Sequence, residues 1–437
     1  MSMRLLSRLL PVALAAFAVT LAVLALGRDG SGEGRAGRPA ALPQALAPRA
    51  STDERIRVLQ DTVRAAPTRA AGYTLLADAY LQKVRESGDA SFYARAQQAV
   101  DRALRLDPGD AGALTQRSSL ALARHDFRAG LRDARRARAL APDVNKPFGV
   151  LVDALLELGR YRDAGRALQA MVDRRPDLAA YARVSYFREL HGDLDGAVAA
   201  MRLAAGAGGE VPESDAYVRT LLGGLELQRG RVGAARHEYR RALLSVPGYP
   251  AAQAGLARVD VARGDLGGAI SRLRRVVDRL PLPEHVIALG EAELAAGRPA
   301  AARRDLALVR AEQRLLGRSG VNTDVELAIF EADHGRPQRA IALARRAWTA
   351  ARSVRSADAL GWALTRAGRP RAALPWARRA LALGSRDPSF LYHAGIAARD
   401  AGHRAQARAC LRRAVAGRAA LSALNGPRAV RALDALR

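Results

Sequence analysis

The sequence predicts an all-α protein built as an α-solenoid, a long array of stacked helix pairs. Hydrophobic residues make up 49% of the 437 residues but aromatic residues only 5%, so much of the apolar content is alanine. Alanine suits closely packed helices, whereas strands favour β-branched and aromatic residues. From Ser51 onward the apolar residues follow a helical period, and the whole pattern returns about every 34 residues. A repeat of that length indicates a stack of similar units.

The first element is an apolar segment near the N-terminus. Arg4 and Arg8 precede an uncharged run from Leu9 to Gly27. A helix over this run would be about 28 Å long, close to the hydrocarbon thickness of a bilayer. We therefore expect residues 1–27 to form an N-terminal hydrophobic helix that acts as an uncleaved signal anchor. The alternative is a cleaved signal peptide, although the nearest small-x-small site, Val23-Leu24-Ala25, lies inside the apolar run.

This segment also sets the expected location. The basic residues before the apolar run, and the reading of the run as a signal, favour a single-pass protein of the cell membrane whose large C-terminal part is extracytoplasmic. Cleavage would instead give a secreted protein. Residues 28–50 are rich in Gly, Pro and Ala and predict a flexible linker.

Glycines and prolines mark the helix ends in the repeat. A glycine is expected between the two helices of most pairs, because it can take a left-handed conformation that costs other residues about 1–2 kcal/mol. These glycines are Gly159, Gly192, Gly230, Gly264, Gly297, Gly335, Gly368 and Gly402. A proline is expected after a second helix, which it cannot continue. These prolines are Pro108, Pro142, Pro176, Pro247 and Pro281.

The pattern resembles the tetratricopeptide repeat (TPR), whose 34-residue unit has the form W-x₂-L-G-x₂-Y…A-x₃-F…P. The first repeat matches it at Tyr73, Leu76, Ala77, Tyr80, Ala96, Ala103 and Pro108. The Leu-Gly pair recurs at Leu222-Gly223, Leu289-Gly290 and Leu360-Gly361. The resemblance implies helix-turn-helix units stacked into a right-handed superhelix. With the apolar N-terminal segment, it points to a bacterial TPR protein of the membrane-anchored or exported type.

The solenoid is expected to span residues 51–437. We predict a half-repeat over 51–69 with Ser51 as N-cap, about ten repeats over 70–418, and a C-terminal cap over 419–437 with Pro427 at a helix start. A small residue is needed where the second helix of each repeat packs closely. The alanines at that position are Ala164, Ala197, Ala235, Ala269, Ala302, Ala340, Ala373 and Ala407.

Three insertions interrupt the regular spacing. Extra residues around the sequence ESGDASF, before Ala96, are expected to lengthen one helix–helix connection. The stretch GAGGEVPES follows Ala204 and accounts for one longer step between repeats. The stretch EQRLLGRSG follows Arg310 and accounts for the other, and we expect it to extend a helix.

The sequence contains no signal for catalysis, so we expect neither an enzyme nor a bound cofactor. There is no phosphate-binding GxxxxGK[ST] or HExxH motif, and Cys410 is the single cysteine. The acidic stretch Asp324–Gly335 holds Glu326, Glu331, Asp333 and His334, which could attract a cation or a basic peptide. The alternative is that these residues are solvated and offset nearby arginines.

The resemblance implies a concave groove lined by first-helix positions, in which a peptide or partner protein binds. Projected onto this chain, the positions are Asp78, Ser119, Asp153, Tyr186, Arg258, Glu291, Asp333, Trp362, Arg366, Tyr392 and Arg399. Tyr186, Asp333, Trp362, Arg366, Tyr392 and Arg399 are our candidates for partner contact, because aromatic residues and arginine are favoured in binding hot spots. For Trp362 and Tyr392 the alternative is packing in the core.

The net charge of +27 gives a second hypothesis, binding of an anionic polymer or an acidic membrane or cell-wall surface. An Arg-Arg pair precedes the packing residue of several second helices and should face solvent, and the resemblance puts those helices on the convex face. The pairs are Arg135-Arg136, Arg240-Arg241, Arg274-Arg275, Arg345-Arg346, Arg378-Arg379 and Arg412-Arg413. The alternative is that these positions are simply polar. Few aromatic residues are available for base stacking, so we do not expect nucleic acid as the partner.

Overall fold

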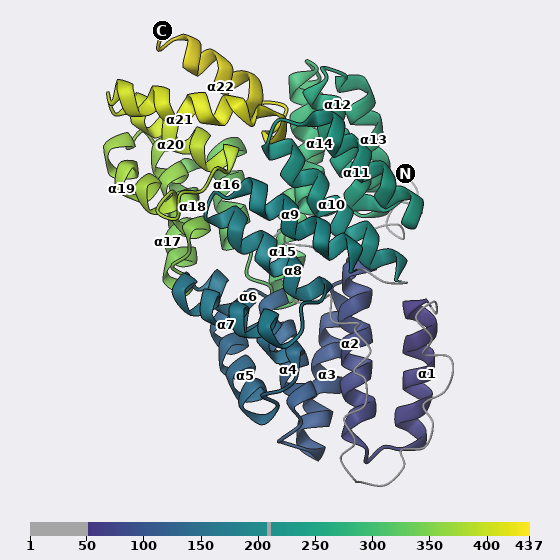
Figure 1. Cartoon of the computed structure of the whole chain (residues 1–437). Helices are drawn as coiled ribbons and strands as arrows, with labels where there is room; N and C mark the ends of the chain where they lie inside the picture. Colours follow the sequence, from purple (N-terminus) through teal and green to yellow (C-terminus); the bar gives the residue numbers. More distant parts are fainter. Residues whose placement is uncertain (1–50, 208–210) are drawn as a thin grey trace.

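The computed structural model describes residues 51–207 and 211–437, and within them the chain is all helix and turn (Figure 1). The predicted anchor over 1–27 and the predicted linker over 28–50 lie outside the described residues. No helix in the described part of the chain combines the length and the apolar character that a membrane span requires.

A single helix, α1 (Thr52–Ala65), precedes ten helix pairs in the described residues, and α22 (Asn425–Asp434) follows them after the one-turn 3-10 helix η3 (Arg418–Ala420). The first helices of the pairs are α2 (Ala70–Ser87), α4 (Ala111–Ala123), α6 (Asn145–Glu157), α8 (Leu178–Leu190), α10 (Pro212–Gln228), α12 (Pro250–Ala262), α14 (Pro283–Ala295), α16 (Asp324–His334), α18 (Val354–Arg366) and α20 (Pro388–Asp400). The second helices are α3 (Ser91–Leu106), α5 (Phe127–Leu140), α7 (Tyr161–Arg174), α9 (Leu194–Gly206), α11 (Val232–Ser245), α13 (Leu266–Arg279), α15 (Pro299–Arg318), α17 (Pro337–Ala350), α19 (Pro370–Ala380) and α21 (Arg404–Ala416).

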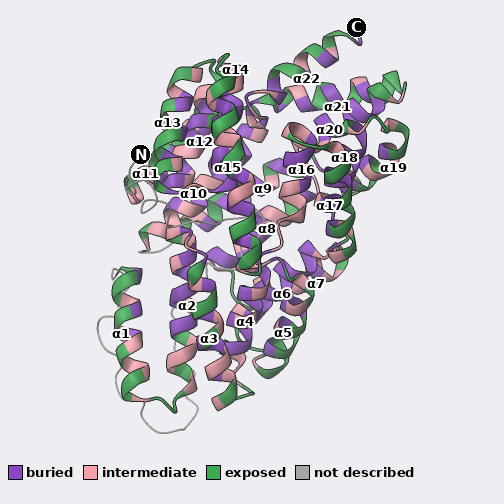
Figure 2. Ribbon diagram, turned by 180° about the vertical axis from the view of Figure 1, so that it is seen from behind, coloured by how far each residue is buried: buried purple, intermediate pink, exposed green. Residues whose placement is uncertain are grey.

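The alanine positions set how closely the helices pack. All eight alanines that the sequence assigned to the close contact of the second helix have no exposed surface. A larger side chain at such a position would cost about 1–3 kcal/mol in overpacking. Figure 2 shows the result for the whole molecule: exposed residues follow outer helices such as α5, α13 and α19, whereas α6 and α18 are almost entirely buried.

The helix ends follow the predicted signals with one exception. Ser51 caps α1 by accepting a hydrogen bond from the backbone N–H of Glu54, and seven of the eight predicted glycines have φ between 72° and 86°. Gly335 instead has a φ of −133°, so the prediction for it was wrong. Its reason for being glycine is a close approach, because a Cβ there would lie 1.9 Å from Oε2 of Glu331.

The prediction of a longer helix–helix connection before Ala96 was also wrong. The extra residues lengthen the helices instead, since α2 has 18 residues and α3 has 16. The turn between them is short, because Gly88 ends α2 in the left-handed conformation with φ 66°. Helix α2 continues because Leu81 and Val84 extend its buried face. The other prediction of this kind is confirmed: the insertion after Arg310 extends α15 to 20 residues.

The solenoid winds back onto itself. The turns after α4, α6, α8 and α10 contact the segments before α16, α18, α20 and η3, and we call this line of contacts the seam. His125 Nδ1 lies 2.5 Å from the carbonyl oxygen of Asn322, and the backbone N–H of Val354 donates to the Tyr161 hydroxyl at 2.8 Å, over separations of 197 and 193 residues. The guanidinium of Arg128 in α5 also donates to the carbonyl oxygen of Thr349 in α17, at 3.0 Å.

The extension of α15 fills the inner side of the first repeats. Leu316 and Val321, at and just beyond its end, are buried in a core cluster with Leu76, Tyr80 and Leu120 of α2 and α4. This face of the N-terminal repeats is therefore covered by the chain's own residues.

Candidate functional site

The predicted groove positions all lie on first helices, but most of them do not face solvent. Ser119, Asp153, Glu291, Trp362 and Tyr392 are each less than a tenth exposed. Asp78, Tyr186 and Asp333 are half-buried, whereas Arg258, Arg366 and Arg399 are exposed. This burial has more than one source. The α15 extension covers the inner side of the first repeats, whereas Trp362 and Tyr392 pack in the core formed by their own and neighbouring repeats.

Some of the buried groove positions join neighbouring repeats. Both carboxylate oxygens of Asp153 accept from the Arg183 guanidinium, at 2.9 and 2.7 Å, across α6 and α8. Glu291 of α14 lies 2.8 Å from His334 Nε2 of α16. Pairs of this kind fix the stacking of the repeats and engage these groups within the chain.

Five of the six partner-contact candidates gather at one place, the C-terminal cluster, made of Asp333 on α16, Trp362 and Arg366 on α18, and Tyr392 and Arg399 on α20. Trp362 Nε1 donates to Asp333 at 3.0 Å, and its ring lies 5.7 Å from that of Tyr392. The Arg366 guanidinium lies over the Trp362 ring at 5.5 Å, in cation–π geometry. The sequence spacing of the repeats thus places these groups on one face of three consecutive first helices.

The cluster has an apolar floor and a positive rim. Trp362 and Tyr392 belong to the main hydrophobic core, as the core-packing alternative requires. Arg366 and Arg399 are exposed above them, and the nearby Arg428 of α22 is exposed as well. Burial raises the pKa of the Tyr392 hydroxyl, while the charges of Arg428, Arg366 and Arg399 oppose that rise. The positive charges of all three guanidinium groups therefore act on the Tyr392 hydroxyl.

A buried ion pair supports the floor from below. Trp362 stacks on His393 with ring centroids 4.2 Å apart, and His393 Nδ1 lies 2.9 Å from a carboxylate oxygen of Asp358. Burial lowers the pKa of His393, but the carboxylates of Asp358, Asp333 and Asp387 outweigh it and raise the pKa on balance. Burial raises the pKa of Asp333. This arrangement orients the tryptophan.

Tyr186 lies apart from the cluster, at the seam. It hydrogen-bonds the half-buried Arg355, which also faces Glu157 and lies 3.7 Å from Glu326. Burial raises the pKa of Tyr186, and it raises the pKa of the Glu157 carboxyl to about 7. Tyr186 therefore contributes to a polar group that joins the two turns of the superhelix.

Most of the charged side chains in the acidic stretch Asp324–Gly335 already have a partner within the chain. Glu331 accepts from Arg310 at 2.9 Å and from the backbone N–H of Arg336 at 3.0 Å. Burial raises the pKa of Glu331, but the hydrogen bonds from Arg310 and Arg336 and the charge of Arg310 lower it on balance. Within the described residues, no group of three or more His, Cys, Asp or Glu side chains is placed to hold a metal ion.

All twelve arginines of the predicted pairs are exposed, and the alanine or valine after each pair is buried. Some of them nevertheless have partners. Arg346 donates to both oxygens of Asp324, at 3.1 and 2.7 Å, and Arg274 pairs with Glu293 and Asp305. The exposed charge on this face is therefore less continuous than the sequence pattern suggests.

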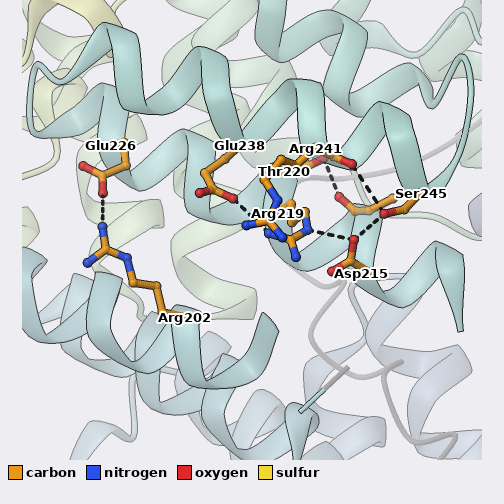
Figure 3. A network of polar contacts seen from close by, with 9 residues as sticks. Arg202, Asp215, Arg219, Thr220, Glu226, Glu238, Arg241 and Ser245 are labelled. Atoms are coloured by element: carbon orange, nitrogen blue, oxygen red, sulfur yellow. Dashed lines mark hydrogen bonds and ion pairs between the residues drawn. The ribbon is translucent and has the colours of Figure 1, made fainter. Parts of the chain in front are cut away.

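The sequence did not reveal a polar network that links α9, α10 and α11 (Figure 3). Arg219 of α10 donates to Asp215 at 2.8 Å and to Glu238 of α11 at 3.2 Å, and Ser245 donates to the same Asp215. Arg202 of α9 donates to the buried Glu226 at 3.1 Å. Arg219 and Asp215 lie on the same helix, but the other pairs join different helices and share no motif, so only the packing of the repeats brings those together.

The comparisons with known proteins agree with the repeat pattern. A family model described as a tetratricopeptide repeat matches residues 150–212, 220–282 and 254–315. No curated protein matches the chain.

Many solved structures share the helical-repeat fold at low sequence identity. A thermophilic TPR protein of Thermus thermophilus is 22% identical, with 40% of this chain and 91% of that chain covered and a TM-score of 0.36. The Cut9–Hcn1 hetero-tetramer of the APC/C is 16% identical over 90% of this chain and 85% of the other, with a TM-score of 0.38. The human IFIT1 dimer with m7Gppp-AAAA is 15% identical over 76% of each chain, with a TM-score of 0.49.

Proposed function

We propose that this chain belongs to the tetratricopeptide repeat family and is a non-enzymatic scaffold that binds a partner protein at the C-terminal cluster. The observation that carries the proposal is the gathering of Asp333, Trp362, Arg366, Tyr392 and Arg399 from three consecutive repeats. A buried aromatic floor with arginine at its rim has the composition of a binding hot spot.

The charge of the rim selects the kind of partner. Arg366, Arg399 and Arg428 are exposed around the Tyr392 hydroxyl, and Asp333, the acidic member of the cluster, already accepts from Trp362. We therefore expect an acidic segment of the partner, whose carboxylates would meet the guanidinium groups. Guanidinium–carboxylate pairs can be bidentate, which gives geometric specificity as well as attraction.

A selection of random peptides on the purified protein tests this proposal. We expect the enriched peptides to carry more Asp and Glu than the starting library and to compete with one another for one site. Enrichment of basic or uncharged peptides, or of peptides with no shared composition, would contradict the assignment.

We also propose that residues 1–27 anchor the scaffold in the cell membrane, with the solenoid on the extracytoplasmic side. The apolar run Leu9–Gly27 and the two arginines before it support this proposal. The alternative remains export with cleavage of the segment.

A second candidate function is adhesion to an anionic membrane or cell-wall surface. The exposure of all twelve paired arginines favours it. Near an anionic bilayer each basic residue contributes about 1 kcal/mol at most, and only within a Debye length. Cosedimentation with acidic and neutral liposomes over a salt series tests this function. Reversing the charges at 345–346, 378–379 and 412–413 should remove any preference for acidic lipid, and equal binding by the reversed protein would refute it.

A further inference from the structure

A hollow on the outer surface, at α11, has an unusual lining. Its volume is about 230 Å³, and it is bordered by Val232, Gly233, Arg236, His237 and Arg240 of α11 together with Arg263, which follows α12. We call it the anion pocket. Four of these six residues are basic, whereas Lys, Arg and His make up only about one residue in six of the whole chain (70 and 7 of 437). The share of basic residues in the whole chain therefore does not account for the number of basic residues that line this hollow.

One of the α11 residues that border the hollow, Arg236, stands at a repeat position that is often apolar. Arg236 directly follows Ala235, the buried alanine of its second helix. In four other repeats the residue after this small position is apolar and buried, and it fills the space between neighbouring helices; these residues are Leu131, Val198, Ile270 and Ile341, with 7%, 1%, 4% and 5% of their surface exposed. Arg236 is half-buried and does not fill the space in the same way.

The charges of the anion pocket have no partner in the described part of the chain. Arg236, His237, Arg240 and Arg263 make no side-chain hydrogen bond or ion pair there, and no acidic side chain borders the pocket. Elsewhere on the second helices, arginines such as Arg272 and Arg346 pair with carboxylates. Like charges that face one hollow without a counter-charge favour an anionic occupant.

We propose that the anion pocket binds a phosphate group. Arginine matches phosphate oxygens with paired N–H donors, and three arginines around one space suit a doubly charged group. Val232 and Gly233 belong to the first turn of α11, where the helix dipole adds attraction in the same direction. The volume is below the roughly 300–1,000 Å³ of pockets for drug-sized ligands, so we expect one or two phosphate groups.

The phosphate could be carried by a soluble diphosphate or by a phospholipid headgroup, and two probes separate these sources. The first is inorganic pyrophosphate, titrated calorimetrically into the full chain. The second is flotation with vesicles of phosphatidylcholine that contain phosphatidic acid. This inference does not depend on the proposed partner site, because Arg366 and Arg399 belong to other helices and stay unchanged in every variant.

Charge reversal at the pocket is compared with a matched control. The pocket variant is R236E/R263E, and the control is R303E/R304E. Arg303 stands on α15 at the repeat position that Arg236 has on α11, and it does not border the pocket. Arg303, Arg304 and Arg263 are exposed and Arg236 is half-buried, so we expect all proteins to fold. The helical circular dichroism of each variant is compared with that of the unaltered chain, and R236Q/R263Q removes the two charges without reversing them.

We expect at least tenfold weaker binding of one or both probes by both pocket variants and unchanged binding by the control. Loss with pyrophosphate identifies a soluble ligand, and loss confined to vesicles identifies a lipid headgroup. Equal binding by the pocket variant and the control, or no binding of either probe by the unaltered chain, would overturn the proposal.

Discussion

At the seam, a glycine can be required for two reasons at once: its backbone conformation and the lack of space for a side chain. Gly192 has φ 76°, and a Cβ there would lie 2.3 Å from the carbonyl oxygen of Gly384 on the opposite turn. Gly368 has nearly the same φ, 72°, but nothing lies within 4 Å of its missing Cβ. The sequence predicted the left-handed conformation of both glycines, because the repeat period marks both positions. It did not predict the close approach, which depends on residues far away in the chain.

These two glycines form a matched pair for measurement. Gly368→Ala should cost about 1–2 kcal/mol, the expense of a left-handed alanine. Gly192→Ala should cost clearly more, because the seam must also move apart. Urea denaturation of both variants provides the comparison, and equal losses would mean that the turns do not touch at Gly192.

Glu157 makes the stability of the seam depend on pH. Its folded-state pKa is raised to about 7 from an ordinary value of 4.5 by burial, so the folded chain holds this proton more tightly than the unfolded chain does. The protonated Glu157 side chain therefore makes its full contribution to the free energy of unfolding below about pH 4.5. That contribution is lost as the pH rises through about 7, and the free energy of unfolding falls by roughly 3 kcal/mol in total.

Glu157→Gln should remove that part of the pH dependence. The substituted chain should gain stability relative to the unaltered chain at pH 8 and show no such gain at pH 5. Thermal melting at both pH values gives the answer. A constant difference between the two proteins across this range would show that Glu157 does not titrate as described.

At the scale of elements, the repeat signals predicted the helices and their order well. They predicted the structure of the insertions less well. Turn glycines, terminal prolines and buried alanines act through local sterics, so the sequence shows them directly. The insertion before Ala96 was predicted as a loop but lengthened α2 and α3, since buried Leu81 and Val84 continue the apolar face. The extension of α15 was predicted, but its docking on α2 and α4 was not, because it depends on the winding of the superhelix.

Neighbouring leucines test the docking of the α15 extension. Leu316 is completely buried against the first repeats, whereas Leu315 is 39% exposed. Leu316→Ala should cost about 2–5 kcal/mol, the usual range for a buried leucine. Leu315→Ala should change stability by less than about 0.5 kcal/mol. Similar losses for the two substitutions, measured by denaturation, would argue against a docked extension.

At the scale of the whole molecule, closure at the seam changes what the repeats can bind. The resemblance predicted an open groove, and the candidate positions did fall on first helices. Five of these eleven positions are buried, however, and three are half-buried. Their burial depends on packing between repeats and on contacts nearly 200 residues apart, and no local pattern encodes those long-range contacts. The C-terminal cluster was largely predictable, since Asp333, Trp362 and Tyr392 fall on the first helices of three consecutive repeats. Its support by His393 and Asp358 was not.

Membrane attachment is a prediction at this scale. The full chain should sediment with membranes and resist extraction by high salt, because its apolar run would be held by hydrophobic transfer. Residues 51–437 alone should remain in the supernatant. Sequencing of the mature N-terminus is the check, and a new terminus at or after residue 26 would exclude the anchor and favour a secreted protein.

The central claim is that the C-terminal cluster binds an acidic partner segment, and the affinity of a selected acidic peptide for charge-reversed variants tests it most directly. We expect R366E/R399E to weaken binding, measured by fluorescence anisotropy, by at least tenfold, because each lost charge-assisted hydrogen bond is worth about 1.5–3 kcal/mol. R371E/R378E reverses two exposed arginines on the outer helix α19, next to α18 in the chain, and should leave the affinity within about twofold of the unaltered protein. Equal weakening by both variants would show that net charge, and not the cluster, holds the peptide, and would contradict the account.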